Sequence, residues 1–205
     1  MSENFTFAAP AHNGLSQRAT RTPTEAHQLR GSAALPLGVS LRALSTHRDR
    51  RGSLTELFRA EWETGISPPQ WNYAESEARV LRGVHAHFRH SDYLILLRGR
   101  SSIGLHDLRE GSPTEGLSAL VELRGEELSA LYIPPGVAHG FYMHEPSIHA
   151  YAVSEYWDSA DELGCHWADP GLGLRWPDAS PLISERDAGL PPLSELKRLP
   201  LWRLP

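Results

Sequence analysis

Residues 82–109 read RGVHAHFRHSDYLILLRGRSSIGLHDLR, and this stretch indicates the fold class. A short polar break separates RGVHAHF from the apolar run DYLILLRGR, and SSIGLHDLR then alternates apolar and polar side chains. The segments LSALVELRG (117–125), LSALYIPPG (128–136) and IHAYAVSEYW (148–157) continue the pattern. Short strands at regular spacing, with Gly, Pro and Asp between them, are typical of an antiparallel sandwich or barrel. We therefore predict an all-β jelly-roll barrel with short peripheral helices.

Three histidines lie at the start of this stretch, at positions 85, 87 and 90. Side chains two residues apart in a strand point to the same face, so His85 and His87 share one face while Val84 and Ala86 take the other. Two imidazoles beside an apolar run that must be core indicate the lining of a pocket. We expect His90 to face solvent in the turn that follows.

The length and the charge of the chain restrict its class. It has 205 residues, enough for one ordinary domain. We predict an N-terminal extension or arm over 1–37, a jelly-roll domain over 38–180 and a C-terminal tail over 181–205. The formal net charge is −5 and the sequence contains no basic block, so a nucleic-acid partner is not expected.

Targeting signals and reactive residues are few. No stretch approaches the roughly 18 consecutive apolar residues of a membrane span, and the first thirty residues lack the apolar core of a signal peptide. We predict a cytoplasmic protein without a membrane partner. Cys165 is the only cysteine, which excludes an intramolecular disulfide and a CxxC site. Lys197 is the only lysine.

A set of short motifs in fixed order resembles the dTDP-4-dehydrorhamnose 3,5-epimerase family of cupin-fold enzymes. The motifs are DRRG (49–52) with Glu56, Gln70 with Asn72 and Ser76, RGVH (82–85), LRG (97–99), SPT (112–114), IPPGVAHGF (133–141), Tyr151 with Tyr156, and WADPGLGLRWP (167–177). The resemblance covers about residues 38 to 180. It implies a cupin jelly roll that acts on a nucleotide-linked 4-keto-6-deoxy sugar.

The resemblance also implies the acid–base groups. A ketone acidifies the hydrogens on the carbons beside it, so a base can remove one proton and an acid can return one to the opposite face. Histidine titrates near neutral pH and suits the base. By resemblance His85 is that base, Asp169 orients its imidazole and Tyr151 is the acid. No cofactor is implied.

Further positions match those that bind the nucleotide sugar in the family. An arginine suits a diphosphate because its planar fork offers two donors. The resemblance also implies a homodimer in which the N-terminal strands are shared between subunits. The matching residues are Arg51, Glu56, Gln70, Asn72, Arg82, His139 and Tyr156.

The chain departs from the family pattern in this same pocket. The family carries a lysine where this chain has Asp92, and an arginine where it has Ile95. That lysine is expected to stabilise the developing enolate oxygen, and a carboxylate reverses the sign of the charge. The family usually reads HYQ where this chain reads HAH at 85–87.

These changes leave alternatives open. The spacing of His85, His87, Asp92 and His139 is that of metal-binding cupins, so a metal-dependent cupin enzyme with one divalent transition metal is one alternative. The run RGVHAH also resembles the dTDP-sugar 3,4-ketoisomerases. A third alternative is a non-catalytic module that binds a sugar nucleotide.

Overall fold

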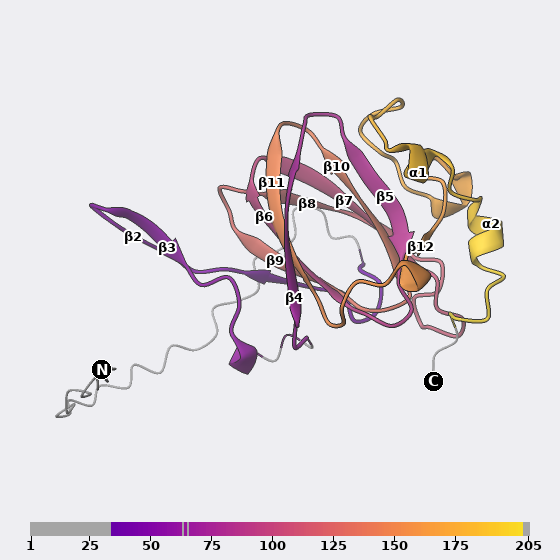
Figure 1. Cartoon of the computed structure of the whole chain (residues 1–205), viewed down its shortest axis with the longest axis horizontal. Coiled ribbons are helices and arrows are strands. Elements are labelled where there is room, and N and C mark those ends of the chain that lie inside the picture. Colours follow the sequence, from indigo (N-terminus) through magenta and orange to yellow (C-terminus); the bar gives the residue numbers. More distant parts are fainter. Residues whose placement is uncertain (1–33, 63, 65, 203–205) are drawn as a thin grey trace, which may run out of the picture.

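The computed structural model describes residues 34–62, 64 and 66–202, and it consists mainly of two five-stranded antiparallel sheets (Figure 1). In spatial order the first sheet contains β1 (Ser40–Ala43), β9 (Ser129–Ile133), β6 (Asp92–Arg98), β11 (Ser147–Val153) and β4 (Gln70–Ser76). The second contains β12 (Leu163–Gly164), β5 (Leu81–Ala86), β10 (Val137–Met143), β7 (Arg100–Asp107) and β8 (Ser118–Arg124). The all-β jelly roll expected from the sequence is confirmed.

The main core lies between the two sheets. Its buried side chains come from both sheets, which the alternation of each strand brings face to face. Leu94 and Leu96 of β6 represent the first sheet, and Ile103 and Leu105 of β7 the second. Ile95, which lies between Leu94 and Leu96 on β6, points to the outer face of the first sheet and joins a separate cluster.

The outer face of the second sheet is covered by the C-terminal segment. Val84 and Ala86 of β5 pack there against Leu193, Leu196 and Trp202. Their placement confirms that β5 turns residues 84 and 86 away from the face that carries His85. The segment after residue 180, expected to be a tail, therefore belongs to the packed body.

The helices found in the described residues are all short. They are α1 (Glu185–Ala188), α2 (Leu193–Leu196) and the single-turn 3₁₀ segments η1 (Ala60–Trp62), η2 (Ser159–Asp161) and η3 (Pro170–Leu172). In the part of the chain that the structure describes, no helix has the length and apolar character needed to cross a membrane.

The hairpin of β2 (Thr46–Asp49) and β3 (Gly52–Thr55) stands apart from both sheets. In Figure 1 it extends away from the body on the side opposite α1 and α2. Most of the expected N-terminal arm, residues 1–33, lies outside the described residues.

Candidate active site

A pocket of about 690 Å³ lies between the two sheets. The first sheet contributes β4, β6 and β11, and the second contributes β5 and β10. The segment that leads into α1 completes the wall. The polar and aromatic lining residues include Gln70, Asn72, Arg82, His85, His87, His90, Asp92, His139, Phe141, His149, Tyr151, Trp157, Glu162, Arg186 and Asp187.

His85 is paired with the carboxylate of Asp187, which was not expected from the sequence. Its Nε2 lies 2.8 Å from Oδ1 of Asp187, and Oδ2 of Asp187 accepts a hydrogen bond of 3.1 Å from the backbone N–H of Gly83. Burial alone would raise the pKa of Asp187, but the hydrogen bond and charge of His85, with the other donors, lower it overall. A carboxylate at Nε2 keeps the proton there and leaves the lone pair on Nδ1.

The local sequence explains this pairing. Ser184 caps α1 by accepting a hydrogen bond from the backbone N–H of Asp187, which fixes the first turn of the helix. Gly83 has φ +109°, and a Cβ there would lie 2.8 Å from the carbonyl oxygen of His139. Only glycine allows β5 and β10 to approach this closely with that backbone.

Asp169 does not take the position expected for it. Its carboxylate accepts hydrogen bonds from the backbone N–H groups of Gly171 and Leu193, and so caps η3 and anchors the start of α2. An Asp before a proline at a helix start is suited to capping. The carboxylate that orients His85 is therefore Asp187 and not Asp169.

Tyr151 faces the pocket from the sheet opposite His85. It lies on β11, where it pairs with Leu94 of β6 and with Asn72 of β4. Burial, followed by the charges of Asp92 and Glu162, raises the pKa of Tyr151, so the phenol is protonated at neutral pH. A base on one wall and a protonated phenol on the other can remove and return a proton on opposite faces of a substrate.

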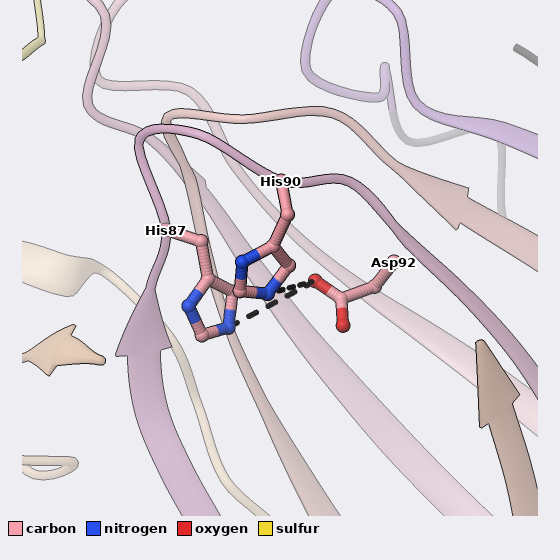
Figure 2. Close-up of side chains that lie close together, drawn as sticks. All are labelled: His87, His90 and Asp92. Carbon is pink, nitrogen blue, oxygen red and sulfur yellow. Dashed lines mark ion pairs between the residues drawn. The ribbon is translucent and has the colours of Figure 1, made fainter. Parts of the chain in front are cut away.

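Three imidazoles surround the carboxylate of Asp92. Figure 2 shows His87 and His90 with ring nitrogens directed at one oxygen of Asp92, Oδ2, at 3.9 and 4.0 Å. Nε2 of His139 lies 3.7 Å from the same oxygen. Burial raises the pKa of Asp92 to about 7, and burial lowers the pKa of His139 well below its usual value.

The alternative metal set is brought together only in part. His87, Asp92 and His139 meet, but His85 is directed at Asp187. His90 lies in the cluster instead of His85, and only 2% of the His90 side chain is exposed. The carboxylate of Asp161 lies 2.8 Å from Nδ1 of His90 and holds this ring inside the protein. The expectation that His90 faces solvent is therefore wrong.

The predicted substrate-binding residues divide into two groups. Gln70, Asn72, Arg82 and His139 line the pocket. Nε2 of Gln70 donates to Oδ1 of Asn72, and Arg82 donates to the Ser76 hydroxyl and to the carbonyl of Glu75.

Arg51, Glu56 and Tyr156 do not line this pocket. Arg51 lies at the tip of the β2–β3 hairpin with 84% of its side chain exposed, and pairs with Asp49. Glu56 pairs with Arg59 on the segment after that hairpin. Tyr156 is 73% exposed, and its neighbour Trp157 lines the pocket instead.

Several residues of the pocket were not expected from the sequence, among them Asp187, His149 and Trp157. The signal at Asp187 is a serine three residues before it, which marks a helix start but not a catalytic contact. His149 lies two residues before Tyr151 on the same strand face, so strand periodicity alone could have placed it there.

The fold and the pocket define a cupin-type enzyme with acid–base groups on facing sheets. The sequence profile described as dTDP-4-dehydrorhamnose 3,5-epimerase matches residues 36–195. The chain belongs to the dTDP-4-dehydrorhamnose 3,5-epimerase family.

Individual relatives support this membership. A dTDP-4-dehydrorhamnose 3,5-epimerase of Streptomyces griseus is 34% identical over 178 residues, which cover 80% of this chain and 88% of the relative. A 3'-monoepimerase of Streptomyces bikiniensis, solved with dTDP-quinovose, superposes with a TM-score of 0.76 at 30% identity, covering 83% of this chain and 91% of that one. A 4-keto-6-deoxy sugar epimerase of Streptomyces spheroides superposes with a TM-score of 0.77 at 28% identity, covering 90% of this chain and 97% of that one.

Proposed function

We propose that this protein epimerises a nucleotide-linked 4-keto-6-deoxy sugar at a carbon beside the ketone. The observation that carries the proposal is the His85–Asp187 pair at 2.8 Å, in one pocket with Tyr151 on the facing sheet. Relatives named as dTDP-sugar epimerases support the class of substrate.

The proposed reaction begins at Nδ1 of His85. This nitrogen takes the proton from the carbon beside the ketone, the C–H electrons form a carbon–carbon double bond, and the ketone oxygen becomes an enolate. Asp187 stabilises the imidazolium that results. Tyr151 then gives its hydroxyl proton to the opposite face of the same carbon, and the ketone re-forms. The imidazolium of His85 releases its proton to solvent and the phenolate of Tyr151 takes one from solvent, so both groups return to their starting states.

The binding residues of the pocket suit the rest of such a substrate. Arg82 provides positive charge for a diphosphate at the pocket wall. Gln70 and Asn72 offer amide groups to sugar hydroxyls or to the base, and Trp157 offers an aromatic surface. His139 completes the wall beside His85, with which it is paired across β5 and β10.

The proposal includes a homodimer in the cytoplasm. Arg51 and Glu56 lie outside the pocket of their own chain, and the β2–β3 hairpin that leads to them extends away from the body. Trp71 and Tyr73 of β4 turn outward and are 43% and 62% exposed, so this sheet offers an aromatic surface to a second copy.

The experiment that tests the reaction measures solvent deuterium entering the sugar of dTDP-4-keto-6-deoxyglucose, by NMR in D₂O. We expect exchange at one or both carbons beside the ketone. His85→Asn should abolish it, because it removes the imidazole that Asp187 holds at 2.8 Å. Another imidazole of the pocket that a carboxylate holds, His90, is directed at Asp92 and not at Tyr151 on the facing sheet. Exchange at the wild-type rate in His85→Asn would refute the proposal.

A matched pair of variants tests which carboxylate supports His85. Asp187→Asn should reduce turnover by roughly two to four orders of magnitude, because it favours the wrong tautomer of the imidazole. Asp169→Asn should keep most of the turnover and lose stability through its caps. The reverse ranking of the two variants would contradict the assignment of Asp187.

A further inference from the structure

Among the described residues, no hydrogen bond joins the carboxylate of Asp92 to the three imidazoles around it. The Oδ2 oxygen of Asp92 lies 3.7 to 4.0 Å from the Nε2 atoms of His87, His90 and His139, and these distances are too long for hydrogen bonds. Asp92 is only 5% exposed and none of the described hydrogen bonds reaches its carboxylate. A buried carboxylate without a donor or a cation is costly.

The outer contacts of the imidazoles determine which nitrogen of each faces Asp92 with a lone pair. Asp161 contacts two of them: its backbone carbonyl lies 3.1 Å from Nδ1 of His87, and its carboxylate lies 2.8 Å from Nδ1 of His90. Nδ1 of His139 contacts the carbonyl of Val137 at 3.1 Å. All three partners are acceptors, so each Nδ1 carries the hydrogen. Each Nε2 therefore presents a lone pair to the space beside Asp92, as in metal-ligating histidines.

The spacing of these atoms suits a small cation. Ligand atoms of His87, His90 and Asp92 all lie within 4.8 Å of one another. Two ligands at about 2.1 Å from a tetrahedral ion are about 3.4 Å apart. The three nitrogen-to-oxygen distances exceed that separation by only a few tenths of an ångström, which small side-chain rotations can close. His139 on β10 is not part of this compact group, but its Nε2 lies 3.7 Å from the same oxygen of Asp92 and can supply a fourth ligand atom.

We propose that His87, His90, His139 and Asp92 form a binding site for one divalent transition-metal ion. Three imidazole nitrogens and one carboxylate oxygen favour Zn²⁺, Fe²⁺, Co²⁺ or Ni²⁺ over Mg²⁺ and Ca²⁺, which prefer all-oxygen sites. Asp161 is the outer residue that orients two of the ligands, since it contacts Nδ1 of both His87 and His90.

The site also suggests a role, which rests on the proposed function. Asp92 occupies the position at which the family resemblance places a lysine. A bound cation would return positive charge to that part of the pocket, where a substrate oxygen would acquire negative charge. Binding of the ion itself is independent of this role, so it can be tested without any substrate.

The test uses the full chain without a histidine tag, because a tag would bind metal itself. Chelator-treated protein is dialysed against Zn²⁺ with Mg²⁺ in large excess, and zinc is then measured by elemental mass spectrometry. We expect about one zinc per chain, as for a single four-ligand site, and a higher melting temperature with zinc than without it. Fewer than a tenth of the chains loaded, with no change in melting temperature, would overturn the proposal.

Variants locate the ion. Asp92→Asn and His90→Gln should lose zinc and its effect on the melting temperature. Asp161→Asn should weaken zinc binding by roughly 10- to 100-fold, as expected for an outer residue. His47→Gln changes an exposed histidine of β2 and should bind zinc like the wild type. Equal zinc binding in Asp92→Asn, His90→Gln and the wild type would show a different site and refute ours.

These outcomes are separable from those of the proposed function. Absence of zinc binding together with deuterium exchange into the sugar would remove the metal site and keep the epimerase. Zinc binding at Asp92 without deuterium exchange into any 4-keto sugar nucleotide would refute the epimerase and support the metal site.

Discussion

Tyr151 is the residue whose removal best separates the two halves of the proposed reaction. Tyr151→Phe deletes only the hydroxyl from a partly buried ring. We expect inversion of the sugar to fall by roughly 100-fold or more. Deuterium exchange should continue, because His85 still removes the proton and returns a solvent deuteron to the same face. NMR of the sugar measures both. Inversion at the wild-type rate in Tyr151→Phe would mean that another group is the acid.

His149 makes a separate prediction about pH. Burial, followed by the charge of Arg82 on β5, lowers the pKa of His149 from 6.5 to about 4. Its other close ring partners are Phe141 on β10 and Tyr151 on its own strand. Because the unfolded state binds the proton more tightly, the stabilisation from this group is complete above pH 6.5 and is lost as the pH falls towards 4.

The variant His149→Phe should remove this pH dependence. The difference of 2.5 pKa units corresponds to a loss of about 3 kcal/mol in the wild type between pH 7 and pH 4. Urea unfolding at several pH values gives the free energy of unfolding for both proteins. The variant should lose less stability than the wild type over this range, and parallel pH profiles would contradict the assignment.

The residues that line the pocket were easier to predict from the sequence than the contacts among them. Strand alternation correctly placed His85 and His87 on the face opposite Val84 and Ala86. The partner of His85 could not be found this way, since Asp187 lies 102 residues away on a helix of four residues. Contacts of that range depend on tertiary packing and not on local periodicity.

Most strands of the two sheets were predicted from the sequence, whereas β4 was not. The runs that became β5 to β11 all alternate or are apolar. β4 was missed because its inward residues, Gln70 and Asn72, line the pocket, while its outward residues, Trp71 and Tyr73, are aromatic and exposed. Its pattern is the reverse of an ordinary half-buried strand.

The C-terminal segment gives a further prediction. The side chain of Trp202 is buried beside α2 and donates a hydrogen bond from Nε1 to the carbonyl of Leu196, at 2.7 Å. Trp202→Ala should cost about 3–5 kcal/mol in the free energy of unfolding. Leu199→Ala, at a position that is 37% exposed, should cost much less. Urea unfolding of both variants measures this, and equal small effects would make the segment a true tail.

The position of the β2–β3 hairpin bears on how two copies of the chain would build one active site. Arg51 matches a substrate-binding position of the family, yet it lies at the tip of a hairpin that extends away from the pocket of its own chain. In a homodimer with shared N-terminal strands, the hairpin of one subunit would reach the pocket of the other. Each active site would then combine His85 of one chain with Arg51 of its partner.

Mixing two inactive variants tests this arrangement. Arg51→Ala and His85→Asn should each have little activity alone. After the two are unfolded together and refolded, about half of the dimers contain one chain of each kind, and each such dimer has one intact site, so about a quarter of the wild-type activity per site should return. Mixing without refolding is the control for slow subunit exchange. If mixed dimers form but activity does not return, Arg51 serves the pocket of its own chain or none at all.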